Sequence, residues 1–204
     1  MARPFTVGIT GGIGSGKTVA SRIFAWLGIA VYNADQRARQ LMETDPRLRA
    51  ALEGHFGKAV FRPDGHLNRT WLGQRIFSDE SERQWINQQV HPAVGRDFTA
   101  WARQQTSPYC LNEAALLIES GRFRDLDRLI VVTAPEAIRL ARVMERDRIE
   151  EAEVRARMAR QLAEDQKQAQ ADFLLHNDGR QGLIPQVVDL HHALLREASA
   201  HEPS

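Results

Sequence analysis

The sequence predicts an α/β fold in which about five parallel strands are flanked by helices. Three observations predict it: short apolar runs are spread along the chain, helical segments separate them, and a glycine-rich stretch, ITGGIGSGKT, joins the first run to the first helix. Nearly continuous apolar runs are typical of strands covered on both faces of a parallel sheet. A chain of 204 residues is long enough for one such domain with insertions.

The predicted strands follow one another along the chain. They cover residues 5–9, 29–33, 109–113, 128–134 and 172–177. After the first strand, the stretch GKTVASRIFAWLG carries apolar residues at helical spacing and ends in a glycine, which is a helix stop signal. The chain therefore opens with a strand, a helix and a second strand.

The region of about residues 36–106 interrupts this alternation. It is rich in polar residues, contains no good strand candidate and is too long to be a simple connection. We expect a helical insertion there, within a single domain (1–204) whose core comprises about residues 1–35 and 107–200. A charged segment at about residues 140–168 is expected to form one or two surface helices that act as a lid.

The composition excludes several classes of protein. A net charge of +1, from 27 basic and 26 acidic side chains, argues against a general nucleic-acid binder. No stretch approaches the ~18 apolar residues of a membrane span, and the stretch MARPFTVGIT lacks the long apolar run expected of a secretion signal. Cys110 is the single cysteine and is expected to be buried rather than catalytic. We expect a cytoplasmic monomer or weak homo-oligomer without nucleic-acid or membrane partners.

The octad GGIGSGKT, residues 11–18, matches the P-loop pattern G-x-x-x-x-G-K-[ST] between a strand and a helix. Glycine permits the positive φ angles that turn N–H groups toward phosphate oxygens, and a helix N-terminus favours negative charge. Lys17 can reach the β- and γ-phosphates, and the Thr18 hydroxyl can bind Mg²⁺. The sequence therefore predicts a P-loop NTPase-type fold that binds ATP or GTP. The expected phosphate-binding residues are Gly12, Ile13, Gly14, Ser15, Gly16, Lys17 and Thr18.

The rest of the chain favours a kinase over a nucleotide switch. A GTPase would need a guanine-reading [NT]-K-x-D motif, and none of the three lysines supplies one. Phosphoryl transfer to an alcohol needs water exclusion and neutralised charge, which a helical insertion and an arginine-rich lid can provide. It also needs a carboxylate near the acceptor hydroxyl. Asp35, just beyond the second predicted strand, suits this role, but it could equally be the N-cap of the helix QRARQLM.

Several motifs are spread over nearly the whole chain, in the order VGITGGIGSGKT, GIAVYNADQRARQL, VHPAV, EAALLIESG, RVMERDR, ARMARQ and ADFLLHNDG. In the order and spacing of these motifs, the chain resembles the dephospho-CoA kinase family. This resemblance implies that ATP, with Mg²⁺, phosphorylates the ribose 3′-hydroxyl of dephospho-CoA to give CoA and ADP. It also implies that the helical insertion binds the CoA moiety.

The resemblance also implies roles for individual residues. Asp35 corresponds to the base or orienter of the 3′-hydroxyl, and Lys17 and Thr18 correspond to the residues that serve phosphate and Mg²⁺. Arg142 and Arg146 correspond to lid arginines that contact ATP phosphates. Asp35, Lys17 and Arg146 are therefore the expected catalytic residues. The remaining expectations place Asn177 beside the nucleotide and Thr10, His91 and Glu113, with Asp35, on the substrate side.

Four positions depart from the family pattern. Asn33 stands where the family has an aspartate, so a second carboxylate near the metal is missing. Glu113 and Ala115 replace the aspartate and the proline of the family's D-x-P-L-L-x-E motif. Glu113 is therefore interpreted as a substrate-side carboxylate or as a solvated charge at a strand end. Arg148 replaces the glycine of an R-D-G turn.

Two further features have more than one interpretation. His91 precedes Pro92, which predicts a turn with a helix starting at or just after the proline, so His91 either caps that helix or contacts the acceptor. Trp71, Trp85 and Trp101 either pack between short helices or line a groove for a pantetheine arm. The alternative functions are a kinase of another small alcohol and a non-catalytic nucleotide-binding regulator.

Overall fold

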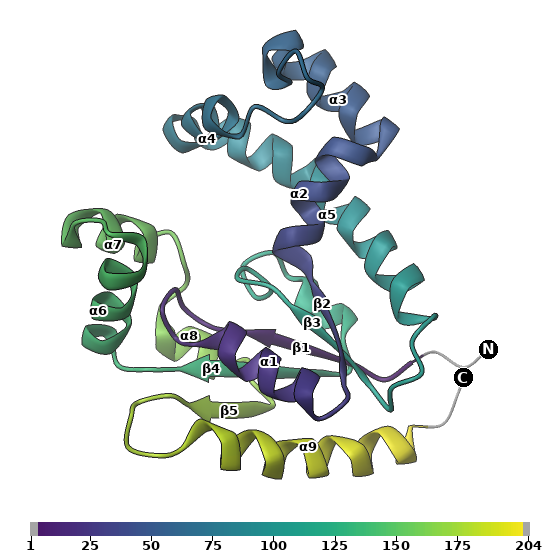
Figure 1. Cartoon of the computed structure of the whole chain (residues 1–204), viewed down its shortest axis with the longest axis vertical. Coiled ribbons are helices and arrows are strands. Elements are labelled where there is room, and N and C mark those ends of the chain that lie inside the picture. Colours follow the sequence, from purple (N-terminus) through teal and green to yellow (C-terminus); the bar gives the residue numbers. More distant parts are fainter. Residues whose placement is uncertain (1–3, 202–204) are drawn as a thin grey trace. The chain divides into compact units, whose positions relative to one another are not determined.

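Five parallel strands form the core of the computed structural model, which describes residues 4–201 (Figure 1). Their order in the sheet is β2-β3-β1-β4-β5, and every neighbouring pair is parallel. The predicted fold class is confirmed, and each strand lies within one residue of its predicted bounds. The strands are β1 (Thr6–Thr10), β2 (Ala30–Asn33), β3 (Cys110–Glu113), β4 (Arg128–Thr133) and β5 (Phe173–His176).

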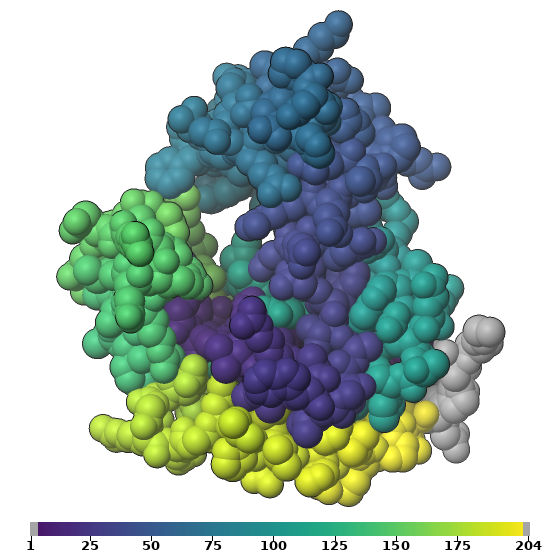
Figure 2. Space-filling view, in the orientation of Figure 1, coloured from purple at the N-terminus to yellow at the C-terminus, as the bar shows by residue number. Residues whose placement is uncertain are grey.

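Helices α1 (Lys17–Trp26) and α9 (Leu183–Ala200) cover one face of the sheet. Val7 and Ile9 of β1 alternate toward this face and are fully buried. Phe24 of α1 lies beneath them and meets Tyr109 edge to face, with ring centroids 6.5 Å apart. Figure 2 shows the side chains of α1, in purple, directly against those of α9, in yellow. This layer fixes the start of α1, and with it the glycine-rich loop.

The opposite face of the sheet is also closed. Gly8 of β1 leaves room for leucine side chains, because a Cβ at this position would lie 2.7 Å from the Cδ1 of Leu126. Cys110 is fully buried, as expected, and burial raises the pKa of its thiol. Burial on both faces explains why the strands are continuous apolar runs. The 3-10 helix η2 (Arg122–Asp125) lies between β3 and β4 in the sequence.

The chain divides into two compact units. The first comprises residues 1–33 and 102–204 and contains the sheet; the second is residues 34–101 and is helical. The role of the helical unit in binding the acceptor stays a prediction. Its elements are α2 (Ala34–Thr44), α3 (Pro46–Phe56), η1 (Lys58–Val60), α4 (Arg69–Ser78) and α5 (Glu80–Ala102), whose last residue belongs to the first unit.

Aromatic rings pack against one another within the helical unit. Trp85 stacks on His55 with centroids 3.8 Å apart, and Phe56 meets Trp71 and Trp85 edge to face. Trp101 stacks on Phe98 of the same helix. These contacts favour the packing interpretation of the three tryptophans, because each ring already has an aromatic partner.

Helix α5 continues through Pro92 without interruption. The predicted turn before this proline is therefore wrong, and His91 does not cap a new helix. An interior proline costs a helix roughly 3 kcal/mol, because it lacks an N–H and crowds the preceding turn. Residues on both sides of it are buried, which offsets that cost and keeps the helix intact: Val90, Ala93, Val94 and Phe98.

Three short helices follow β4, in the region predicted to be a lid. They are α6 (Glu136–Asp147), α7 (Glu151–Met158) and α8 (Glu164–Gln168). Arg148 separates α6 from α7 in the left-handed conformation, with φ = 53°. This position favours glycine, as at many helix C-termini. No helix within residues 4–201 is long and apolar enough to cross a lipid bilayer.

Candidate functional site

The loop between β1 and α1 requires glycine for two physical reasons. Gly14 and Gly16 have φ angles of 80° and 95°, which residues with a side chain rarely adopt. A Cβ would also have no room, since it would lie 2.5 Å from the Arg139 carbonyl oxygen at Gly14 and 2.0 Å from Asn177 Nδ2 at Gly16. Backbone conformation and close packing together keep the loop tight at the start of α1.

Three side chains converge where this loop enters α1. Lys17 Nζ lies 2.8 Å from Glu113 Oε1, and the Thr18 hydroxyl donates to the same oxygen at 2.7 Å. Glu113 ends β3, and its Cα pairs in register with Ile9 of β1, so the sheet itself delivers the carboxylate to the loop. The Lys17 and Glu113 side chains are 14% and 4% exposed. Glu113 is therefore not a solvated charge at the strand end.

The Glu113 carboxyl is held in its ionised form. Burial by itself would raise its pKa, but the charge of Lys17 and the hydrogen bonds from Lys17 and Thr18 outweigh burial and lower the pKa below 4.5. An ionised carboxylate and a hydroxyl side by side are the hard oxygen donors that Mg²⁺ prefers. Within the described part of the chain there is no group of three or more His, Cys, Asp or Glu residues suited to a metal. A cation here would depend on these two residues and on the ligand's own oxygens.

Arg142 and Asn177 brace the glycine-rich loop. Asn177 Nδ2 donates to the carbonyl oxygen of Ser15 at 2.8 Å, and Arg142 donates to the carbonyl oxygen of Asn177 at 3.1 Å. A second nitrogen of Arg142 lies 3.4 Å from the carbonyl oxygen of Gly14. The structure thus brings both expected nucleotide-side residues to the loop, one from α6 and one from the end of β5.

Arg146, one turn further along α6, has different contacts. Its guanidinium makes two hydrogen bonds to the Asp147 carboxylate, at 2.7 and 3.0 Å, and its side chain is 63% exposed. Asp147 also accepts a hydrogen bond from Arg157 of α7, at 3.0 Å. In this structure Asp147 links α6 to α7 and Arg146 pairs with it, while Arg142 contacts the loop.

Gln161 is a loop contact that sequence reasoning missed. The Ile13 N–H donates to Gln161 Oε1 at 2.8 Å. The neighbouring N–H of Leu162 donates to Glu119 at 3.1 Å, and Glu119 pairs with the fully buried Lys167 at 3.0 Å. The buried pair therefore holds the turn before α8 against the glycine-rich loop. Gln161 ends the motif ARMARQ, but nothing in the composition of that motif predicts a hydrogen bond to the loop.

The remaining predicted site residues lie on three different elements. Asp35 is exposed in the first turn of α2, which begins at Ala34, so the alternative N-cap role does not fit. A negative charge in this turn is favourable, because it faces the positive end of the helix dipole. His91 is half-buried within α5. Thr10 is buried at the end of β1, with its hydroxyl 3.4 Å from the carbonyl oxygen of Ala115.

Comparisons with known proteins find similarity over nearly the whole chain. A family model described as dephospho-CoA kinase matches residues 5–182. The dephospho-CoA kinases of Aggregatibacter actinomycetemcomitans and Vibrio cholerae are 39% and 38% identical, over 95% and 94% of this chain and 96% of each relative. The crystal structure of TT1252 from Thermus thermophilus superimposes with a TM-score of 0.82 at 31% identity, over 96% of this chain and 98% of that one. A shikimate kinase from Acinetobacter baumannii, with a TM-score of 0.50 at 13% identity, covers 95% of this chain and 94% of its own and shares the fold alone.

The Lys17–Glu113 pair generates a stability prediction. Lys17→Met leaves the buried Glu113 carboxylate without its cation and should lower the free energy of unfolding by roughly 3 kcal/mol. The double variant Lys17→Met/Glu113→Gln should recover most of this loss, because it removes both charges. Urea denaturation followed by circular dichroism measures both. If the double variant loses as much free energy of unfolding as Lys17→Met and Glu113→Gln lose separately, the two side chains are not coupled.

Proposed function

Because the chain belongs to the dephospho-CoA kinase family, its reaction is the ATP-dependent phosphorylation of dephospho-CoA in coenzyme A biosynthesis, and we propose how its residues carry out that reaction. The glycine-rich loop binds the donor triphosphate. The helical unit binds dephospho-CoA, and the ribose 3′-hydroxyl receives the phosphoryl group. The donor site is supported by one observation: Lys17, Thr18 and Glu113 converge at the start of α1.

On the donor side, oxygens of the bound phosphates take the place of protein oxygens that accept hydrogen bonds in this structure. Glu113 holds the Lys17 ammonium at the N-terminus of α1, where a phosphate binds readily. Likewise, Gln161 Oε1 accepts from the N–H of Ile13, and a phosphate oxygen that takes this N–H replaces it. Both contacts keep the donors in place before the nucleotide arrives, so little reorganisation accompanies binding.

Thr18 and Glu113 are the residues that would hold Mg²⁺. Their oxygens are 2.7 Å apart, and the lowered pKa of Glu113 keeps its carboxylate charged at neutral pH. When bound, Mg²⁺ neutralises the charge that develops on the transferring phosphates. On this proposal Glu113 serves the donor side, whereas the family resemblance implies a role on the substrate side.

On the acceptor side, Asp35 orients the 3′-hydroxyl and accepts its proton. The residue directly follows β2, and in α/β proteins ligands bind beyond the carboxyl ends of the strands. As the hydroxyl oxygen forms its bond to the γ-phosphorus, the bond to the ADP oxygen breaks and the proton passes to the Asp35 carboxylate. Arg142 and Arg146 supply positive charge to the phosphates, Arg146 after it leaves Asp147.

The proposed reaction is tested with a panel of acceptors. Purified protein, ATP and Mg²⁺ should consume ATP with dephospho-CoA and yield CoA and ADP in equal amounts, measured by chromatography. Adenosine, gluconate and shikimate serve as competing alcohols. Turnover of one of these without turnover of dephospho-CoA would overturn the assignment, and nucleotide binding without any transfer would favour a regulator.

Asp35→Asn should lower kcat by roughly 10²-fold or more and leave ATP affinity within about two-fold, because the carboxylate acts mainly in the transition state. Steady-state kinetics give kcat, and calorimetry gives the ATP affinity. Asp64→Asn, an exposed change of the same kind in the helical unit, is the matched control. A kcat near that of the wild type would exclude Asp35 as the base.

Arg146→Gln should lower kcat by roughly ten-fold, because a phosphate-neutralising charge is lost from the transition state. Arg155→Gln is the control: Arg155 lies in the same lid and is exposed beside Glu136 and Glu151. Steady-state kinetics compare the two variants. Equal kcat values would make Arg146 a surface partner of Asp147 with no part in catalysis.

A further inference from the structure

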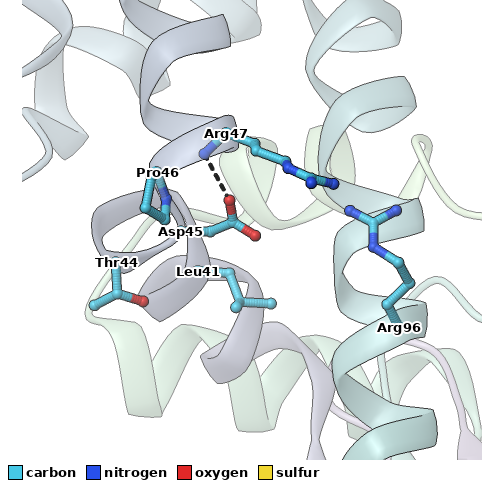
Figure 3. Close-up of a pocket in the computed structure, with 6 residues that line it drawn as sticks. All are labelled: Leu41, Thr44, Asp45, Pro46, Arg47 and Arg96. Atoms are coloured by element: carbon cyan, nitrogen blue, oxygen red, sulfur yellow. Dashed lines mark hydrogen bonds between the residues drawn. The ribbon is translucent and has the colours of Figure 1, made fainter.

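A pocket within the helical unit lies apart from the residues assigned above (Figure 3). It has a volume of about 420 Å³, within the usual range for small-molecule sites. It forms where α2 meets α3, with α5 as its other wall. The lining residues are Leu41, Thr44, Asp45, Pro46, Arg47 and Arg96.

The two arginines of this pocket differ from most arginines of the same unit. Arg37, for example, pairs with Asp97 at 2.6 Å. In contrast, no ion pair or hydrogen bond among the described residues involves the guanidinium of Arg47 or Arg96. Figure 3 shows these two groups directed toward each other from α3 and α5. Other paired arginines of the unit are Arg62, Arg69, Arg75 and Arg83.

One acidic residue, Asp45, also lines the pocket. One of its carboxylate oxygens accepts the N–H groups of Arg47 and Leu48, at 2.8 and 3.2 Å, and so caps α3. The pocket therefore combines two cations with one carboxylate, and its lining keeps a net positive charge. Facing guanidinium groups repel each other, and an anion between them removes the repulsion. Their planar, forked donors suit a ligand with several anionic oxygens, as in a phosphate or diphosphate.

We propose that Arg47 and Arg96 bind the 5′-diphosphate of dephospho-CoA, an inference that rests on the proposed function. Leu41 follows Asp35 by six residues on α2, about 9 Å along the helix axis. Arg96 is adjacent to Asp97, and Asp97 pairs with Arg37 of α2, so α5 and α2 are held together beside the pocket. The ribose and the diphosphate of one acceptor, together with the length of an arginine side chain, can cover an axial rise of this size. The pocket thus fixes the acceptor at a second point while Asp35 engages its hydroxyl.

Charge-neutral variants test this assignment. Arg47→Gln and Arg96→Gln should each raise the KM for dephospho-CoA by roughly ten-fold, and the double variant should raise it further, since each change removes a charged hydrogen bond. The kcat and the KM for ATP should stay within about two-fold, because binding and not chemistry is weakened. Arg62→Gln is the matched control, an exposed arginine of the same unit paired with Asp64. A dephospho-CoA KM in the double variant equal to that of the control would overturn the proposal.

Binding experiments without ATP identify the ligand of the pocket. By calorimetry, the double variant should lose affinity for dephospho-CoA, while its affinity for adenosine, which lacks the diphosphate, should be unchanged. If instead inorganic phosphate binding is lost and the dephospho-CoA KM is unaffected, the pocket binds free phosphate and the assignment is wrong. Failure of the wild-type protein to phosphorylate dephospho-CoA would overturn the proposed function itself, which is a separate result.

Discussion

The buried ion pair between Lys17 and Glu113 is the interaction on which the donor site depends. It joins the first residue of α1 to the end of β3, 96 positions away. Only the parallel pairing of β1 with β3 brings the two together. The cores on both faces of the sheet fix that pairing, because the strands are buried on each side. Packing in the core of the sheet therefore determines where Lys17 is held. Lys17 in turn keeps the Glu113 carboxylate ionised.

The sheet register also places Asn33 next to Glu113. Asn33 ends β2 directly beside Glu113 on β3, so the two positions open onto the same edge of the sheet. Of these two neighbouring strand ends, only that of β3 carries a carboxylate in this chain. Glu113 also has the additional carbon that lets it contact both Lys17 and Thr18. On the proposed function, the donor side therefore relies on the single carboxylate of Glu113.

The segment from α6 to α8 is physically connected to the glycine-rich loop. Arg142, Asn177 and Gln161 all bond to the loop backbone, so its main-chain groups are held by side chains from three separate segments. The fully buried Lys167 and its partner Glu119 fix the turn that carries Gln161. At the end of α6, Arg148 occupies a left-handed backbone conformation that is suited to glycine.

The sequence by itself determined the strands, their parallel arrangement and the phosphate loop, because these depend on local patterns: continuous apolar runs, and glycines at fixed spacing before a helix. Tertiary structure decided the rest. It made Glu113 the partner of Lys17, placed Gln161 at the loop, carried α5 through Pro92 and directed Arg47 and Arg96 into one pocket. Each of these depends on residues far apart in the chain, whose contacts arise from packing and leave no local pattern in the sequence.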